Sequence, residues 1–362
     1  MKINIERERF ADAIGWVLRS VSTRATLPAL GGVLFDAQGS TVRLAGTDLE
    51  LAGEATVEAK VEEAGSVVLP GRVLGEIARS LPEGAVRIET SGGQAIVACG
   101  AAEFTLRTLP VEDFPQLSPA EGGAGGAIEA KTFAQAVSQV TRAASSDEAR
   151  PVLTGTLLEA ATDTLTLVAT DSYRLAVRTI DWKGPAEPIK RVIPARALVE
   201  AARASDGTGE ITIALGESQA VFTVEGRRLT TRLIEGEFPN WGQLIPGDLP
   251  NELRIDRELF AEAVRRVGIL AQSGAPVRIE LTSDGAKLGA GSQDVGEAHE
   301  MVQGKFEGEP LTIAFNPQYL LDGINAVEGT EVVLATRDGL KPAVVRAPED
   351  AGYAYLAMPV RI

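Results

Sequence analysis

One helical pattern occurs three times in this chain at nearly constant spacing. The segments FADAIGWV, FAQAVSQV and FAEAVRRV begin at Phe10, Phe133 and Phe260. Each has apolar residues at positions i, i+3, i+4 and i+7, which predicts an amphipathic helix. A single match would be uninformative, because any amphipathic helix can show it, but three at a near-constant interval indicate an internal repeat. The chain is therefore expected to fold as three copies of one unit.

A second landmark keeps the same period. A helix-like stretch begins at a proline in each copy, at Pro70, Pro194 and Pro317. Proline suits the first turn of a helix, where its missing N–H needs no partner. Between the helices, alternating segments such as TVRLAG, AVRIET and AVFTVEG predict half-buried antiparallel strands. Each copy is therefore expected to be an α+β unit with few helices and many strands.

Two breaks separate the copies. The glycine-rich SPAEGGAGGA (118–127) is typical of a flexible linker, and IPGDLPNEL (245–253) is typical of a turn between domains. We therefore expect three domains, 1–120, 127–246 and 251–362, each close to the usual size of a domain.

Several classes of site are excluded by what the sequence lacks. Cys99 and His299 are the only cysteine and histidine, which rules out disulfides within the chain and leaves too few ligands for a structural zinc site. We expect Cys99 to be a small buried residue and His299 an ordinary strand residue. No phosphate-binding glycine motif appears, so no nucleotide cofactor is expected. The charged start MKINIERERF and the lack of a long apolar run predict a cytoplasmic protein that contacts no membrane.

An aspartate recurs at a predicted strand end in every copy. Asp48 in LAGTDLELA, Asp171 in LVATDSYRLA and Asp294 in GAGSQDVGEA keep the period of the repeat. A residue repeated in all copies is better explained as a turn former that caps its own backbone than as a catalytic acid. Only in the middle copy is the aspartate followed by Ser-Tyr-Arg-Leu (172–175). Any function specific to the middle copy is therefore expected from those side chains.

Charge is unevenly distributed along the chain. The net charge of −15, taken alone, argues against a nucleic-acid partner. The helix-like stretches nevertheless hold twelve basic and seven acidic residues. These stretches are 7–21, 72–80, 131–142, 195–204, 257–266 and 317–326. These arginines and lysines suit either solvated helix faces or, if the helices gather on one side, a weakly basic surface that contacts phosphates without reading bases.

Four further segments carry a family resemblance: TRATLPALGGVL (23–34), ATDSYRLAVR (169–178), LTIAFNPQYLLDGI (311–324) and the terminal YLAMPVRI. With the three repeats, they make the chain resemble the bacterial DNA polymerase III beta subunit, the beta sliding clamp, over essentially its whole length. The resemblance implies an α+β fold of three similar clamp domains, with antiparallel sheets outside and helices lining a central hole. Two chains would then form a head-to-tail dimeric ring of six domains.

The resemblance also implies a function without enzymatic activity or cofactor. The ring would encircle duplex DNA without reading its sequence, slide along it and act as a DNA polymerase processivity factor. The DNA polymerase III alpha subunit, the clamp loader, other polymerases and repair proteins would dock by short peptides in a groove between the second and third domains.

Site residues follow from the same resemblance. The positions that match the peptide-binding groove are Leu153, Thr170, Arg174, Leu175, Pro239, Leu244, Met358, Pro359, Val360 and Arg361. Those that match the dimer interface are Phe104 and Leu106 on one protomer and Ile269 and Leu270 on the other. Those that match DNA contacts are Arg24, Arg150 and Arg196. The chain departs from the common pattern at Ser172-Tyr173 and at Trp241-Gly242-Gln243, which bears on peptide preference.

Two other interpretations remain open from the sequence. One is a cytosolic enzyme that uses Asp171 and Tyr173 as acid and base. The other is a clamp paralogue with a specialised role, such as tolerance to an inhibitor that binds the groove.

Overall fold

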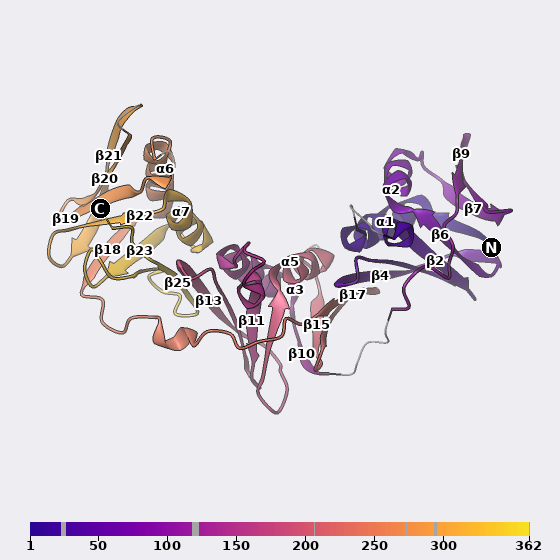
Figure 1. The fold of residues 1–362 in the computed structure, drawn as a ribbon, viewed down its shortest axis with the longest axis horizontal. Helices are drawn as coiled ribbons and strands as arrows, with labels where there is room; N and C mark the ends of the chain where they lie inside the picture. Colours follow the sequence, from indigo (N-terminus) through magenta and orange to yellow (C-terminus); the bar gives the residue numbers. More distant parts are fainter. Residues whose placement is uncertain (23–26, 118–122, 206, 272–273, 293–294, 362) are drawn as a thin grey trace. The chain divides into compact units, whose positions relative to one another are not determined.

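The computed structural model describes residues 1–22, 27–117, 123–205, 207–271, 274–292 and 295–361 (Figure 1). Within these residues the chain forms two compact units. Unit 1 comprises Met1–Lys131 and Glu200–Leu233, and unit 2 comprises Thr132–Val199 and Ile234–Ile362. The central repeat is therefore divided between the units, and each unit contains strands from it.

The three repeated helical motifs form helices, as predicted. They are α1 (Arg7–Val17), α3 (Ala130–Val140) and α6 (Arg257–Gly268). The aromatic ring that opens each motif, from Phe10, Phe133 or Phe260, is completely buried. Glu6 caps α1 and Asp256 caps α6 by accepting hydrogen bonds from backbone N–H groups of the first turn.

The second helix of each copy also forms where the prolines predict it. These helices are α2 (Gly71–Ser80), α5 (Ala195–Ala202) and α7 (Pro317–Ala326). Pro70 and Pro194 end the strand directly before the helix, whereas Pro317 is the first helical residue. Helix α1 packs beside α2, and α6 beside α7 (Figure 1). The shorter helical turns are η1 (Leu18–Ser20), η2 (Pro28–Gly31), η3 (Thr141–Ala143), α4 (Pro151–Thr154), η4 (Arg203–Ser205) and η5 (Trp241–Gln243).

Unit 1 is built on two antiparallel sheets. Its strands are β1 (Lys2–Glu6), β2 (Gly32–Gln38), β3 (Thr41–Thr47), β4 (Leu51–Glu58), β5 (Lys60–Glu63), β6 (Gly65–Pro70), β7 (Ala85–Ser91), β8 (Gln94–Cys99), β9 (Ala102–Arg107), β10 (Ala124–Glu129), β15 (Glu210–Leu215), β16 (Gln219–Val224) and β17 (Arg227–Arg232). One sheet has the order β5-β1-β7-β8-β9, and the other β10-β15-β16-β17-β4-β3-β2-β6. The second sheet joins strands of the first and central repeats through the β17–β4 pair.

Unit 2 contains one sheet of twelve strands. They are β11 (Gly155–Ala160), β12 (Thr164–Thr170), β13 (Arg174–Asp181), β14 (Ile189–Pro194), β18 (Asn251–Asp256), β19 (Val277–Thr282), β20 (Gly285–Ser292), β21 (Gly296–Glu307), β22 (Leu311–Phe315), β23 (Glu331–Thr336), β24 (Ala343–Arg346) and β25 (Tyr353–Ala357). The order is β14-β11-β12-β13-β25-β24-β23-β18-β21-β20-β19-β22. The β13–β25 pair joins the central and third repeats, as β17–β4 does in unit 1.

The flexible linker predicted over 118–127 is wrong for its second half. Ala124–Glu129 form strand β10, which pairs with β15 along its whole length. A side chain at Gly125 would place a Cβ only 1.9 Å from the carbonyl oxygen of Ile213. The glycine there permits close approach of two backbones, a use of glycine that resembles a linker in sequence.

The single cysteine and the single histidine lie as predicted. Cys99 is buried, with its Sγ donating to the carbonyl of Pro82 at 3.2 Å, and His299 lies in β21. Among the described residues, no group of three or more His, Cys, Asp or Glu side chains could hold a metal ion. None of the helices in the same part of the chain has the length and apolar character needed to cross a membrane.

Candidate functional site

The turn after β12 is built by Asp171. Its Oδ1 accepts hydrogen bonds from the backbone N–H groups of Tyr173 and Arg174 at 2.9 and 3.0 Å. The Thr170 hydroxyl donates to the carbonyl of Arg174 at 2.6 Å and accepts from the N–H of Ser172 at 3.1 Å. Ser172 has a φ of 81°, in the left-handed region, and these hydrogen bonds hold it there. The prediction that Asp171 forms the turn is confirmed.

The first repeat contains the same aspartate turn. Asp48 Oδ1 accepts hydrogen bonds from the N–H groups of Glu50 and Leu51 at 3.1 and 2.8 Å. Asp294, the third aspartate of the pattern, lies outside the described residues. Turn formation therefore explains the recurrence in both copies that are described, and no catalytic role is needed for it.

Arg174 lies within the wall of the site and not on its open face. Its side chain is 12% exposed, and its guanidinium lies over the Tyr319 ring, 4.4 Å from the centroid. The guanidinium Nε donates to Asp171 Oδ2 at 3.0 Å, and a terminal N–H donates to Asp322 Oδ2. Both carboxylates bind Arg174, so its guanidinium supports the turn. That Arg174 also lines the groove stays a prediction.

The surroundings of Arg174 favour its charged form. Burial alone would lower the pKa of the guanidinium, but Tyr355 and the carboxylates of Asp322 and Asp171 raise that pKa above its ordinary value. For Tyr355, burial has the opposite effect and raises the pKa of the phenol, because it disfavours the charged phenolate. The Tyr355 hydroxyl donates to the carbonyl of Tyr319 at 2.8 Å. These contacts tie the start of β13 to helix α7.

A cluster of buried apolar side chains, here called the apolar floor, lies beside the turn. Leu175 and Leu356 face each other across the β13–β25 pair. The other members of this buried cluster are Leu157, Val168, Val177 and Val192. The partly buried side chains that pack against it are Ile234, Phe238, Trp241 and Ile245.

Large apolar side chains at the edge of this floor face solvent. Tyr173 is 60% exposed, Leu244 48% and Met358 42%. The N–H of Met358 donates to the carbonyl of Tyr173, and that of Leu244 to the carbonyl of Trp241, both at 2.9 Å. A solvent-facing apolar edge around a buried apolar floor is typical of a surface that binds an apolar ligand or a peptide.

The remaining predicted groove residues lie on the adjoining segments. Leu153 is buried at the end of α4, and Pro239 is exposed between Phe238 and η5. The N–H of Val360 donates to the carbonyl of Ala314 at 2.8 Å, which fixes the end of the chain against β22. Pro359 is half-buried and Arg361 is exposed on the same terminal segment.

The sequence analysis did not place Leu356, Phe238 or Ile245 at this floor, and it named Trp241 only as a departure from the family's pattern. One signal was available for part of this set. The Phe-Pro dipeptide at Phe114 recurs at Phe238, at the period of the repeat, and both phenylalanines pack against an equivalent cluster in their own unit.

The predicted dimer residues lie at unpaired or exposed positions. Phe104 and Leu106 are half-buried on one face of β9, the last strand of its sheet, which pairs only with β8 among the described residues. Ile269 is 69% exposed directly after α6, and Leu270 beside it is half-buried.

A second open strand edge was not predicted. Strand β21 pairs with β20 from Gly296 to Gln303 and with β18 only from Gly304 to Glu307. In the part of the chain that is described, no strand covers the other edge of β21 from 296 to 303. An uncovered edge of this length invites pairing with another strand.

The predicted DNA contacts are only partly described. Arg24 lies outside the described residues. Arg150 donates from Nε to Asp147 Oδ2 at 2.8 Å and from a terminal N–H to the Ser172 hydroxyl at 3.0 Å, which places it beside the aspartate turn. Arg196 is exposed on helix α5.

Comparison with known proteins covers nearly the whole chain. Residues 1–118, 127–240 and 242–361 match the N-terminal, central and C-terminal domains of the DNA polymerase III beta subunit. The beta sliding clamp of Streptomyces coelicolor is 40% identical over 375 residues, with 100% of both chains covered. The beta sliding clamp homolog GriR of Streptomyces muensis is 33% identical and covers 100% of this chain and 99% of its own.

Solved structures give the same result for the fold. The Bacillus subtilis DNA polymerase sliding clamp superimposes with a TM-score of 0.95 at 29% identity, covering 100% of this chain and 99% of that one. The Pseudomonas aeruginosa clamp bound to griselimycin also gives 0.95, at 30% identity and full coverage of both chains. Members of this family are non-enzymatic processivity factors, which removes the enzyme interpretation of Asp171 and Tyr173. The chain belongs to the DNA polymerase III beta subunit family, the bacterial beta sliding clamps, and consists of three clamp domains.

Proposed function

We propose that this protein is the cytoplasmic processivity clamp of a bacterial DNA polymerase. Two chains form a head-to-tail ring around duplex DNA, with three domains per chain bounded at 1–120, 127–246 and 251–362. The ring slides on DNA and holds the DNA polymerase III alpha subunit, the clamp loader, and other polymerases and repair proteins by short peptides.

The observation that carries this proposal is the apolar surface of unit 2. Leu175 and Leu356 form its floor, and the exposed side chains of Leu244 and Met358 stand at its edge. Burying two large apolar side chains of a peptide there is worth roughly 3–6 kcal/mol before ordering costs. Such a surface suits modest, exchangeable binding, as a clamp with several partners requires.

The ring is supported by the open strand edges. Strand β9 of one protomer and residues 296–303 of β21 of the other each lack a partner on one side among the described residues. Pairing these edges head to tail twice would close a symmetric dimer with neither edge left free. Ile269 and Leu270, next to α6, would add apolar contact to this interface.

Direct contacts between the ring and DNA would be to the phosphate backbone alone. The helix-like stretches carry a basic excess on an otherwise acidic chain, and contacts from arginines such as Arg24, Arg150 and Arg196 would be independent of sequence. Direct affinity should then be weak and strongly salt-dependent.

A topological assay tests the ring. Clamp loaded by its ATP-driven loader onto nicked circular DNA should stay bound at moderate salt and dissociate when the circle is cut to a linear form. Equal retention on circular and linear DNA would indicate ordinary surface binding and contradict the ring. Light scattering of the free protein should give about twice the 38.0 kDa chain mass.

A peptide titration tests the groove. A peptide of the Gln-x-x-Leu-Phe kind should bind wild type, and Met358→Ala should weaken it about tenfold or more through lost contact area. Asp171→Asn is the control, because its charge contacts only the turn and Arg174. Normal binding to Met358→Ala, with loss in a folded Asp171→Asn, would place the pocket elsewhere.

A clamp paralogue tolerant of a groove inhibitor is the second candidate. The 33% identity to GriR, a protein described as a beta sliding clamp homolog, supports only the paralogue part of this candidate, and the identity to the Streptomyces coelicolor clamp is higher at 40%. Titration with griselimycin separates the two, since a tolerant paralogue should bind it much more weakly than it binds the Gln-x-x-Leu-Phe peptide. Tight griselimycin binding would favour the replicative clamp.

A further inference from the structure

The part of the unit 2 sheet formed by β19, β20 and β21 has one covered face and one open face. Helix α6 packs against all three strands (Figure 1). Along β19, Val277, Ile279 and Leu281 are buried, whereas Arg278 and Glu280 are exposed. Because successive side chains of a strand point to opposite faces, Arg278 and Glu280 lie on the face away from α6.

Two glycines of β20 leave a depression in this open face. Register places Gly289 between Arg278 of β19 and His299 of β21. A Cβ at Gly289 would lie 3.0 Å from His299 Nδ1, and a Cβ at Gly291 would lie 3.1 Å from Glu297 Cγ. The side chains of β21 therefore lean over the middle strand, which contributes no side chain of its own at these two positions.

The depression belongs to a cleft with a volume of about 650 Å³. Its other walls include residues 275–276, before β19, and Arg361 near the end of the chain. The terminal segment is held at this place because the N–H of Val360 donates to the carbonyl of Ala314. Ala314 in turn pairs with Arg278 across the β19–β22 ladder, so the whole cleft is built within unit 2.

Four charged or titratable side chains of the cleft lie in pairs. Lys287 Nζ is 3.2 Å from Glu280 Oε2, and His299 Nε2 is 3.5 Å from Glu297 Oε2. Each of these carboxylates therefore already has a basic neighbour on the same face of the sheet.

Two arginines of the cleft are open to a ligand. Arg278 and Arg361 are both exposed, and neither side chain makes a hydrogen bond or an ion pair with any described residue. A guanidinium presents its N–H donors in a planar fork that matches the two oxygens of a carboxylate or a phosphate. The unpaired charges of the cleft therefore favour an anion.

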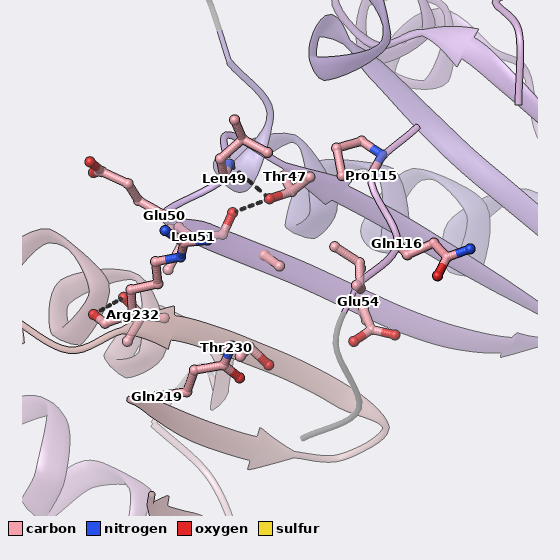
Figure 2. A pocket seen from close by; sticks show the side chains of 13 residues that line it. Thr47, Leu49, Glu50, Leu51, Glu54, Pro115, Gln116, Gln219, Thr230 and Arg232 are labelled. Carbon is pink, nitrogen blue, oxygen red and sulfur yellow. Dashed lines mark hydrogen bonds between the residues drawn. The ribbon is translucent and has the colours of Figure 1, made fainter. Parts of the chain in front are cut away.

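The cavity of unit 1 shows the opposite arrangement of charge. It has a volume of about 110 Å³ and lies between the aspartate turn, the β4–β17 pair and the segment 115–117. Figure 2 shows Thr47 at the turn and Gln116 on the segment opposite it. The buried Glu54 accepts hydrogen bonds from Arg43 at 2.8 Å and from Arg228 Nε at 2.9 Å. Glu54 thus takes up two arginine charges that would otherwise be open to an anion.

Carboxylates beside Arg278 restrict the kind of anion that fits the unit 2 cleft. Register places Glu280 in the row of residues on one side of Arg278, and Glu297 in the row on the other side. A nucleic-acid strand carries a charge at every nucleotide and would bring phosphates against these carboxylates. A peptide with only one or two acidic side chains can contact the arginines and avoid them. The charge pattern therefore favours an acidic peptide.

The cleft adjoins the proposed groove through the terminal segment. Met358 stands at the edge of the apolar floor, and Arg361 lines the cleft three residues later. Three residues of extended chain span at most about 10–11 Å. A peptide seated in the groove therefore needs only a few further residues to reach the cleft.

We propose that this cleft binds an acidic segment of the same partner whose short peptide fills the groove. Aspartate or glutamate side chains of that segment pair with Arg278 and Arg361. The inference rests on the proposed function, because the groove brings the segment to the cleft. The proposed ring leaves the cleft open, since pairing of β21 with a second chain uses the edge of the sheet and not its face.

Titration of paired peptides into the full-length protein tests the inference. Each peptide carries the Gln-x-x-Leu-Phe motif and two aspartates about four residues beyond it, on the N-terminal or the C-terminal side. A matched peptide carries asparagines at the same positions. At one of the two ends, the aspartate peptide should bind about threefold to tenfold more tightly than its match at low salt.

The sign of this effect makes it specific. The chain has a net charge of −15, so a general electrostatic effect would weaken the binding of an acidic peptide. Tighter binding therefore reports a local contact with basic groups. It should disappear near about 0.5 M salt, because the arginines are exposed.

Three variants assign the contact. Arg278→Gln should bring the ratio of the two dissociation constants close to one. Glu297→Gln removes a neighbouring negative charge and should raise the ratio about twofold, a gain that damage to the fold would not produce. Arg265→Gln is the matched control, because it removes the same charge from an exposed position of α6, on the other face of the sheet. It should leave the ratio unchanged.

The outcomes separate this inference from the proposed function. Equal affinities of the aspartate and asparagine peptides at both ends, or an undiminished ratio in Arg278→Gln, would overturn the inference while leaving the groove intact. If no peptide with the motif binds, the proposed groove and this inference fail together. If a short oligothymidylate removes the aspartate effect where an aspartate-rich tetrapeptide at equal concentration does not, the cleft binds nucleic acid and the peptide assignment is wrong.

Discussion

Replacing Arg174 by methionine should destabilise unit 2 strongly. The substitution keeps an unbranched apolar stem but removes the charge that lies between Asp171 and Asp322, whose side chains are 11% and 10% exposed. Removing one partner of a buried ion pair typically costs about 3–5 kcal/mol. Asp171 would keep its two backbone N–H donors, and Asp322 would keep a hydrogen bond from Gln318 at 2.8 Å. We therefore expect the lower end of that range, about 3 kcal/mol.

A double-mutant cycle with Asp322→Asn isolates the pair. The asparagine keeps the shape of the side chain and removes its charge, so the double variant should lose less than the sum of the two single losses. The coupling free energy for groups in contact is typically about 0.5–3 kcal/mol. Urea unfolding followed by tryptophan fluorescence is the assay, because Trp182 and Trp241 both report on unit 2.

The reasoning has a clear point of failure. A loss of about 3 kcal/mol corresponds to a midpoint shift of about 1 M urea or more at the usual m-values. If Arg174→Met shifts the midpoint by less than a third of that, or if the two substitutions are additive, the cluster does not stabilise the junction between β13 and α7. Arg150→Met, at an exposed ion pair, is the matched control and should cost less than about 1 kcal/mol.

Three further outcomes are expected. Ile269→Glu should yield monomers in light scattering with little loss of unfolding free energy, because the side chain is 69% exposed in a single chain; a stable dimer would rule out this interface. Gly125→Val should lower the unfolding free energy of unit 1 by about 2 kcal/mol or more, because its Cβ would meet the backbone of β15. Gly247→Val is the control and should be close to neutral, because a Cβ there would have nothing within 4 Å; similar urea midpoints for the two variants would contradict the close approach. Burial raises the pKa of Tyr355 above its unfolded value of about 10, so the stability that this residue contributes is present below pH 10 and is lost as the pH rises further. Tyr355→Phe should therefore flatten the fall of the urea midpoint between about pH 10 and 11.

Patterns within short stretches of sequence were enough to predict most of the helices and the turn. The three Phe-Ala motifs, the prolines before the second helices and the turn at Asp171 all depend on contacts within a few residues, so the sequence could predict them. Strand β10 was not predicted because its glycines are needed for close contact with the backbone of β15, which lies some 90 residues later in the chain.

The site was predictable only where a side chain's surroundings were local. The position of Leu175 on the floor follows from its strand, but the burial of Arg174 depends on Asp322, which lies 148 residues away. The cavity in unit 1, which Thr47, Ala52, Gln116 and Thr230 help to line, was not predicted, because its walls come from segments far apart in the chain.

The left-handed residues Leu49 and Ser172 have a consequence for recognition. Neither is glycine, and a side chain in this conformation costs about 1–3 kcal/mol unless the surroundings impose it. The aspartate and threonine hydrogen bonds around each turn impose it in the free protein, so the turn beside the proposed groove is rigid before any ligand arrives. Binding then reduces the conformational entropy of the ligand, but it costs little further entropy in the protein, because this part of the protein was already ordered on folding. Association with such an edge should be fast and need no rearrangement, and differences in affinity among ligands should appear in how quickly each one leaves.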